Sequence, residues 1–237
     1  MNMKKMTICA MMAMALPVAA WAQEEESENG LYAELGANMV TNYIWHGQNL
    51  GGLSLQPSLT VGWNDLSLNV WGSAGIATDD HREIDFSLGY ELGNLSLAVT
   101  DYWYVGAGET EKFFNYSAHS TYHTLEAAVG YDFGFCSLLW STYFGGNDYD
   151  EDGDRVYTSY IQADVPFTIG SFEGVATVGA TPWNSPTYDA RRFMVCEAAV
   201  ALSKEVKITP TFSVNATGKV AVNPATEDTF FVFGIGF

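Results

Sequence analysis

The chain has 237 residues and carries 28 acidic against 10 basic side chains, for a formal net charge of −18. Such an acidic excess argues against nucleic acid and against anionic lipid headgroups as direct partners, because both carry charge of the same sign. Only three residues are cysteine, and this number is too small for a disulfide scaffold.

The first 22 residues have the parts of a secretory signal peptide. Lys4 and Lys5 precede an apolar stretch from Met6 to Ala19, and Ala20-Trp21-Ala22 supplies a cleavage site of the small-x-small type. Cleavage removes two lysines and no acid, so the formal charge moves from −18 to −20. We expect an exported chain with three parts: a signal peptide at 1–22, an acidic periplasmic lead at 23–30, and a folded part at 31–237.

From Leu31 onward, segments of about ten residues alternate between apolar and polar side chains. In LSLQPSLTVGW, for example, Leu55 and Leu59 share one face while Gln56 and Ser58 share the other. A period of two is typical of a strand, and a strand that crosses a bilayer with a tilt needs ~9–11 residues. No segment after the signal peptide approaches the ~20 consecutive apolar residues of a transmembrane helix.

Counting these segments gives about twelve strands, an even number as in bacterial single-chain barrels. The expected connections alternate between short turns and longer polar loops, which is the arrangement of periplasmic turns and extracellular loops in the outer membrane. This arrangement predicts that both termini lie in the periplasm. The expected short turns are Asn64-Asp65, Gly93-Asn94, 132–134, 166–171 and 203–210.

The last segment, TFFVFGIGF, is expected to be the strand that closes the barrel. Phe233, Ile235 and Phe237 share one apolar face of this strand. A terminal phenylalanine in such a strand resembles the signal that the barrel assembly machinery recognises, so we expect these three residues to form an assembly signal.

A secreted sandwich of two sheets is the main alternative fold, because it also has short alternating strands. Here, however, nearly every strand combines a large aliphatic and aromatic face with a face of small polar and acidic residues. In lipid every backbone group must be paired internally, and a closed barrel achieves this without free edges. We therefore predict an all-β, transmembrane, antiparallel up-and-down barrel in the outer membrane of a Gram-negative cell.

The segment TNYIWHGQNLGGLSLQPSLTVGW, Thr41 to Trp63, resembles the opening hairpin of the TorF-type porins. That family carries a Tyr-x-x-Arg-Gly segment followed by a glutamine in the returning strand. Tyr43, Gly47 and Gln56 match this pattern, whereas His46 stands where arginine is usual. The chain is also similar to uncharacterised outer-membrane proteins of Bacteroides-like bacteria. The resemblance implies a channel, although a fold alone does not fix a function.

The inward faces of the strands decide what a barrel does, and here they carry several acids and few bases. Lys219 is the only basic residue within an expected strand. An acidic lumen attracts cations and repels anions. We therefore expect a small porin, not an enzyme, that passes small solutes or ions with a preference for cations. The alternative is a non-conducting structural or surface-interaction barrel, since twelve strands lie between filled and open barrels. The expected pore-lining residues are Glu34, Asn38, Asn42, Gln56, Asn69, Trp71, Asp85, Glu91, Glu126, Gln162 and Asp164.

The loop NDYDEDGDR has the spacing that begins a calcium loop. Asp148, Asp150 and Asp152 alternate before Gly153, so three carboxylates could converge on one Ca²⁺ ion at 148–154. The position of the usual bidentate glutamate holds Ser159, however, and no flanking helices are expected. The favoured interpretation is therefore a solvated acidic loop, or one loosely bridged by divalent ions at the cell surface, and no cofactor is expected apart from this Ca²⁺ candidate.

The histidines suggest a third, less favoured function. His119 and His123 lie close to Ser117 and Ser120, and His123 falls on the lipid-facing side of its strand. Some outer-membrane barrels are lipid hydrolases with serine and histidine on the outer wall, but such a site is defined by geometry. A position in the interfacial aromatic belt is the more common role of such a histidine.

Two cysteines, Cys136 and Cys196, remain after signal cleavage. Three expected strand spacings of ~4.8 Å separate them, which amounts to ~14 Å around the wall. A disulfide needs Cα atoms within ~7 Å, so we expect two free thiols. Both cysteines fall on the side of their strands that is expected to face lipid.

Overall fold

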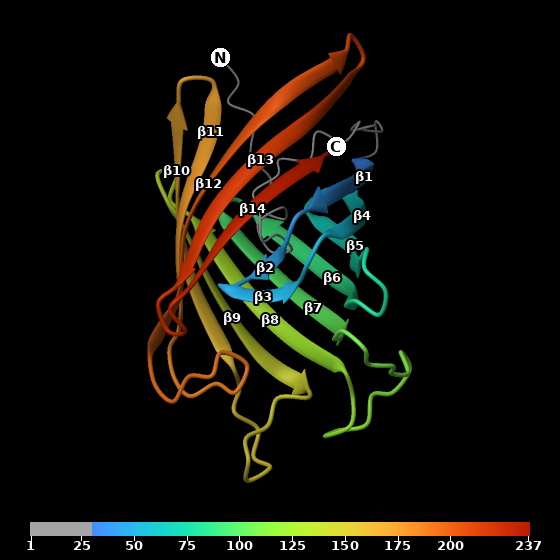
Figure 1. Ribbon diagram of the computed structural model, residues 1–237, viewed down its shortest axis with the longest axis vertical. Coiled ribbons are helices and arrows are strands. Elements are labelled where there is room, and N and C mark those ends of the chain that lie inside the picture. The colour runs from blue at the N-terminus through green and yellow to red at the C-terminus, as the bar shows by residue number, and fades with distance from the viewer. Residues whose placement is uncertain (1–29) are drawn as a thin grey trace.

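A computed structural model describes residues 30–237, so the expected signal peptide and the acidic lead up to residue 29 lie outside the described residues. The described residues form fourteen strands, and twelve of these close into an antiparallel barrel (Figure 1). The predicted fold class and strand number are thus confirmed. The strands are β1 (Leu31–Val40), β2 (Tyr43–Trp45), β3 (Gln48–Gly51), β4 (Ser54–Trp63), β5 (Leu66–Gly75), β6 (Arg82–Leu92), β7 (Leu95–Val105), β8 (His123–Asp132), β9 (Ser137–Gly146), β10 (Ser159–Ile169), β11 (Phe172–Thr181), β12 (Met194–Thr209), β13 (Phe212–Asn223) and β14 (Asp228–Gly236).

Each barrel strand pairs with its neighbours in the chain, and β1 pairs with β14 to close the ring. The closing seam is short, with three register pairs between β1 and β14 against ten between β1 and β4. It is extended by Phe237 and Ala37, which exchange two backbone hydrogen bonds of 3.1 Å. Phe233, Ile235 and Phe237 therefore lie in the chain segment that closes the barrel against β1.

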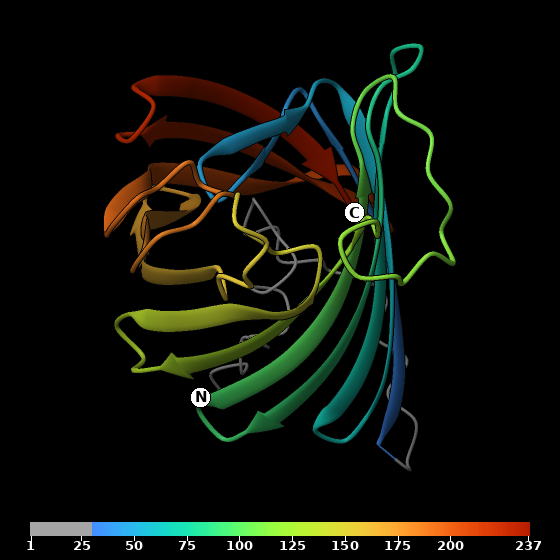
Figure 2. The same ribbon diagram turned by 90° about the horizontal axis from the view of Figure 1, so that it is seen from below.

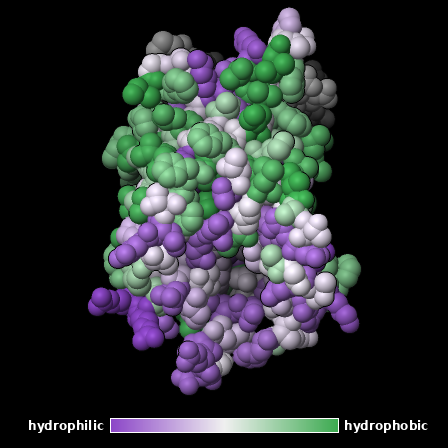
Figure 3. All heavy atoms as spheres, viewed as in Figure 1, coloured by the Kyte–Doolittle hydropathy of each residue, from purple (hydrophilic) through white to green (hydrophobic). Residues whose placement is uncertain are grey.

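The outer wall is apolar because successive side chains of each strand point alternately outward and inward, and large apolar residues occupy the outward positions. Leu35 on β1 is 64% exposed and Phe233 on β14 is 66% exposed, while their chain neighbours Gly36 and Val232 are buried. Figure 3 shows the resulting apolar band above a polar end formed by the loops. A band of this kind is the surface that a barrel presents to lipid. Within residues 30–237, no helix is long and apolar enough to span a membrane.

The expected connections at 166–171 and 203–210 are wrong, because β10 continues to Ile169 and β12 continues to Thr209. Two-residue turns, Gly170-Ser171 and Pro210-Thr211, follow these strands instead. In β12 the charged residues alternate with Val206 and Ile208, and this stretch still pairs with β13. The β12–β13 hairpin accordingly projects beyond its neighbours at the upper end of the barrel (Figure 1). The extension places Lys204 and Lys207 within a strand, and Arg82 begins β6, so Lys219 is not the only basic strand residue.

Both cysteines are free thiols, as predicted, but Cys196 does not face lipid. A bulge in β12 causes the difference, since Gly179 pairs with Glu197 whereas Ala180 pairs with Val195. Cys196, the residue left over between these pairs, turns inward and packs with Tyr160, with an exposed fraction of 1%. Alternation along a sequence cannot reveal such a one-residue irregularity.

The different environments of the two thiols predict different reactivity. In the folded barrel, a membrane-permeant maleimide should label the half-buried Cys136 and leave the buried Cys196 unmodified, whereas denaturation should expose both. Mass spectrometry of peptides after labelling measures this directly. Rapid labelling of Cys196 in folded protein would contradict the bulge, and a disulfide on a non-reducing gel would contradict the strand order.

The seam predicts that Phe237→Asp impairs assembly. The substitution places a carboxylate in the apolar outer wall next to the ring of Phe212, whose centroid lies 6.3 Å from that of Phe237. Phe237→Tyr keeps the ring and serves as the control. We expect less heat-modifiable, membrane-inserted protein for Phe237→Asp and normal levels for the control. Equal levels of both variants would show that the side chain has no part in assembly.

Candidate functional site: the lumenal hairpin and the inner wall

The connection between β1 and β4 forms a hairpin that folds into the barrel. It comprises β2 and β3, residues 43–51, and we call it the lumenal hairpin (Figures 1 and 2). His46 and Gly47 form its two-residue turn with φ angles of 48° and 77°. Two successive residues with positive φ are typical of the turn that matches the twist of a tight hairpin. An inward fold of this connection was not predicted from the sequence.

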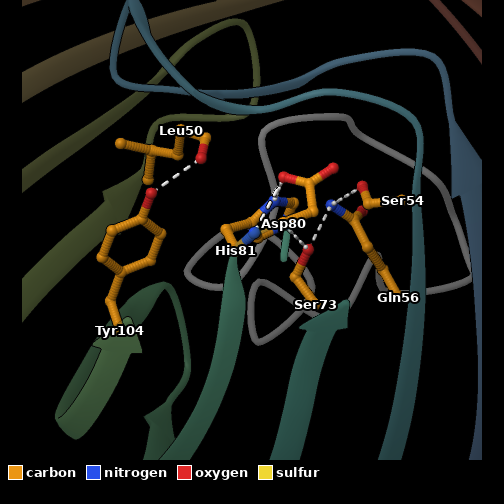
Figure 4. Close-up of polar contacts among 7 residues, drawn as sticks. All are labelled: Leu50, Ser54, Gln56, Ser73, Asp80, His81 and Tyr104. Atoms are coloured by element: carbon orange, nitrogen blue, oxygen red, sulfur yellow. Dashed lines mark hydrogen bonds and ion pairs between the residues drawn. The ribbon is translucent and has the colours of Figure 1, made fainter. Parts of the chain in front are cut away.

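On one side, the lumenal hairpin is fixed to the wall formed by β5, β6 and β7. The hydroxyl of Tyr104 donates a hydrogen bond of 2.7 Å to the carbonyl oxygen of Leu50, as Figure 4 shows. The ring of Tyr43 lies 5.5 Å from that of Trp71 and 5.6 Å from that of His81. These contacts bring the start and the end of the hairpin against the same inner wall.

His81 is itself held in place by a polar network at the mouth of this wall (Figure 4). Its Nε2 lies 2.8 Å from Ser73 Oγ, and its Nδ1 lies 3.1 Å from Asp80 Oδ1. Gln56 donates weak hydrogen bonds to Ser73 and Ser54 at 3.4 and 3.5 Å. The hydrogen bond from the His81 backbone amide, together with the one from its ring, lowers the pKa of Asp80 below its usual value.

On the opposite side, the tip of the lumenal hairpin contacts β10, β12, β13 and the loop at 182–193. The ring of His46 stacks on Tyr160 with centroids 3.6 Å apart, and its Nδ1 lies 2.7 Å from the hydroxyl of Tyr188. Gln48 Nε2 donates to the carbonyl of Thr187 at 2.8 Å. A further hydrogen bond of 3.1 Å runs from the amide of Asn223 to the carbonyl of Gly47. The hairpin therefore spans the lumen from wall to wall.

His46 contributes no positive charge to the lumen. Burial lowers the pKa of His46 well below its usual value, and the charge of Lys219 lowers it further. The neutral ring stacks on Tyr160, where a hydrated cation would lose its water. The position at which the TorF-type pattern has arginine is thus occupied by an uncharged side chain.

The two walls beside the lumenal hairpin differ in charge. On one wall, Lys219 Nζ lies 2.6 Å from Glu197 Oε1, so the basic side chain is neutralised by a buried partner. On the other wall, Glu83, Asp85 and Glu126 are buried on the inner faces of β6 and β8. No basic side chain among the described residues forms an ion pair with these three acids. The lumen therefore carries a one-sided excess of carboxylates.

Most of the expected pore-lining residues lie on the inner faces of barrel strands. Gln162 donates to Asp164 at 2.7 Å, and Tyr102 donates to Glu126 at 2.9 Å, so these groups meet across or along the inner wall. Asn42 differs, because it lies on the bend between β1 and β2. The remaining inward residues of the set are Glu34, Asn38, Gln56, Asn69, Trp71, Asp85 and Glu91.

Several residues of the site were missed by the sequence analysis. Glu83 was not among the expected pore-lining residues, although it continues the alternation of Asp85 and Glu91 along β6. Tyr160 and Tyr188 were not connected with the hairpin, because long-range contacts leave no local signal. The detectable signal was the segment YIWHGQNLGG, whose aromatic and polar residues lack a continuous apolar face for lipid.

The acidic loop does not form the calcium site that its spacing suggested. Asp148 accepts a hydrogen bond from the Thr158 amide, while Asp150 accepts from the amides of Asp152 and Asp154. Among the described residues, no group of three or more His, Cys, Asp or Glu side chains could hold a metal ion. The carboxylates are engaged in shaping the loop, as Asx turns do.

The hydrolase arrangement is not formed either. His123 Nδ1 lies 2.8 Å from Asp101 Oδ1, and its Nε2 contacts the carbonyl of Phe113, so no serine hydroxyl accepts or donates at the ring. The hydroxyl of Ser120 instead points to the carbonyl of Ser117. Although His123 is on the outward side, the connection between β7 and β8 covers it. Figure 2 shows this connection outside the ring of strands.

Comparisons with known proteins assign no family to the chain. No family model and no curated protein matches the chain. Among solved structures, the chain is similar to Pseudomonas aeruginosa OccK9 (13% identity, TM-score 0.38, covering 90% of this chain and 64% of that one). It is also similar to the NanC porin, with 12% identity and a TM-score of 0.44, over 85% of this chain and 97% of that one. A mutant of the Rh. blastica porin is similar as well, with 14% identity and a TM-score of 0.38, over 89% of this chain and 74% of that one. The chain thus spans less than two thirds of OccK9, and likeness at this level assigns no family.

Gly47 offers a direct test of the docked hairpin. A Cβ atom at this position would lie 1.9 Å from the carbonyl oxygen of Cys196, and the φ angle of 77° disfavours any other residue. Holding a non-glycine residue in such a conformation costs about 1–3 kcal/mol. Gly47→Ala should therefore loosen the lumenal hairpin and speed amide hydrogen exchange at 43–51 by roughly ten-fold or more.

The matched control is Gly93→Ala in the β6–β7 turn, where φ is also positive but nothing lies within 4 Å of the added carbon. It should leave exchange in the hairpin unchanged. Hydrogen–deuterium exchange mass spectrometry on folded protein in detergent measures both variants. Unchanged exchange at 43–51 in Gly47→Ala would mean that the hairpin is not packed against β12.

Proposed function

We propose that the protein is a porin-type channel of the outer membrane that passes small solutes or ions, with a preference for cations. The observation that carries this proposal is the lumenal hairpin, which is bound to both walls and leaves the acids Glu83, Asp85 and Glu126 beside it. An inward loop that narrows a barrel and a lining of one charge sign are the features that select permeating solutes.

The charge distribution supports a preference for cations. Glu83, Asp85, Glu126 and Asp164 lie on the inner wall and form no ion pair with a basic side chain of the part of the chain that the structure describes. Lys219, in contrast, is neutralised by Glu197. Low-dielectric walls concentrate the field of such charges and raise the local concentration of cations. Figure 3 shows that the surface is hollowed between the loops at the polar end, where a solute would enter.

The cellular setting is part of the same proposal. The N-terminal signal sequence, the apolar outer wall and the seam at Phe237 support export and insertion into the outer membrane of a Gram-negative cell by the barrel assembly machinery. In this setting the short turns and both termini face the periplasm and the long loops face outward. Tyr43, Gly47 and Gln56 support membership of the TorF-type porins.

The second candidate is a barrel that does not conduct. The same lumenal hairpin favours it, because a hairpin bonded on both sides, together with inward aromatic rings, could fill a twelve-stranded lumen completely. Conductance in planar bilayers separates the two functions. Stable openings support the channel, and their absence from correctly folded protein supports the closed barrel.

The ion preference depends on the inward acids. Wild-type protein should give a reversal potential of cation-selective sign in a salt gradient. Replacing Asp85, Glu91, Glu126 and Asp164 by the corresponding amides should move that potential towards zero, because the fixed negative charge of the lumen is removed.

The control for this experiment changes the same number of acids in exposed loops: Glu109, Glu111, Glu151 and Asp152. These charges are screened by solvent, so their replacement should have a smaller effect. Anion selectivity of the wild type, or an equal shift in both variants, would contradict an acid-lined path.

A further inference from the structure

Two carboxylates on β6 form a compact group beside the lumenal hairpin. Glu83 and Asp85 are two residues apart on the same inward face, with exposed fractions of 6% and 4%. Tyr43, from the hairpin, lies beside this group, because its ring is 5.5 Å from that of Trp71, the register partner of Asp85. Asp85 interacts electrostatically with both Glu83 and Glu126. Two buried acids therefore meet at the point where the hairpin leaves the wall.

Among residues 30–237, no basic side chain forms an ion pair with either acid. The basic groups that do pair with carboxylates are His81 with Asp80, His123 with Asp101, and Lys219 with Glu197. Arg82 precedes the pair in the chain, but its guanidinium donates to the carbonyl of Glu109 on the exposed side. Buried carboxylates without a partner are costly, so a cation or protons from solution must balance them.

One oxygen of each carboxylate is free to accept a hydrogen bond. Glu83 Oε2 and Asp85 Oδ1 are fully buried and have no hydrogen-bonding partner within the protein. Most buried polar atoms in proteins are satisfied, so two free acceptors on adjacent acids indicate a position for a ligand that donates hydrogen bonds. A cation with several N–H donors fits this requirement.

Aromatic side chains surround the pair. Trp71 and Tyr102 are the register partners of Asp85 on the two neighbouring strands, and Tyr104 is the partner of Glu83. Tyr43 completes the group, because its ring lies 5.5 Å from that of Trp71. Aromatic faces attract ammonium and guanidinium groups, and combined with carboxylates they are typical of sites for organic cations. A metal ion is less suitable, since the described residues contain no group of three or more acids, histidines or cysteines that could hold one.

We propose that Glu83 and Asp85 bind the ammonium group of a small amine within the lumen. The ammonium donates hydrogen bonds to Glu83 Oε2 and Asp85 Oδ1, and its carbon substituents lie against Trp71 and Tyr102. This inference deepens the proposed function, because it names small amine cations as a solute class of the channel. Since the ring of Tyr43 lies beside Trp71, the register partner of Asp85, occupation of the site also couples to the start of the lumenal hairpin.

Binding is tested on folded barrel in detergent, without any requirement for conduction. Isothermal titration calorimetry with methylammonium chloride, with sodium chloride at the same ionic strength as the reference, should give a saturable heat for wild-type protein. The double variant Glu83→Gln/Asp85→Asn should weaken binding at least ten-fold, because it removes the charge and keeps the shape. The fluorescence of Trp71 should respond to methylammonium in the wild type and lose this response in the double variant.

The control is the double variant Glu173→Gln/Glu205→Gln, which removes the same charge at exposed positions on β11 and β12. It should bind methylammonium within two-fold of the wild type. Heat-modifiable mobility on gels verifies folding of every variant, and the two single variants replace the double variant if that protein does not fold.

Three results would overturn the site: no heat with methylammonium in the wild type, equal binding of sodium, or unchanged binding in the Glu83 and Asp85 variants. Failure of the channel itself has a different signature. Binding without conductance would preserve the amine site and contradict passage, whereas conductance without binding would preserve the channel and contradict the site.

Discussion

Closure of the backbone is the constraint on which the rest of this structure depends. In lipid, an unpaired N–H or C=O group costs several kcal/mol, so a strand that crosses the membrane must be bonded on both sides. The twelve barrel strands meet this requirement through the pairing of β1 with β14, where the register is short and Phe237 extends it to Ala37. Once the ring is closed, the alternation along every strand sends apolar side chains to lipid and polar ones to the lumen.

The lumenal hairpin adds long-range contacts inside this scaffold. It is held by hydrogen bonds to Tyr104 on one side and to Tyr188, Thr187 and Asn223 on the other. These partners belong to β7, β13 and the loop at 182–193, so the hairpin also ties distant parts of the wall together. It also lies beside the wall that carries the buried acids Glu83 and Asp85.

The sequence was sufficient for the barrel because strand alternation, short turns and an apolar final strand each have a local cause. Inward positions such as Asp85 and Asp164 follow from the same period. The lumenal hairpin could not be predicted, since stacking of His46 on Tyr160 joins residues more than a hundred positions apart. Cys196 was assigned to the wrong face because a single bulge reverses the alternation. Spacing alone also suggested a calcium loop at Asp148, although backbone amides bind these carboxylates instead.

The central claim is that the lumenal hairpin, which is bonded to both walls, narrows the lumen. Because Val40 and Ser54 face each other in the register of β1 and β4, residues 41–53 can be replaced by a two-residue Asn-Gly turn. The most direct measurement is the single-channel conductance of this variant in planar bilayers, after folding is verified by heat-modifiable mobility. The account predicts a conductance several-fold above that of the wild type. Equal conductance of the two proteins would contradict it.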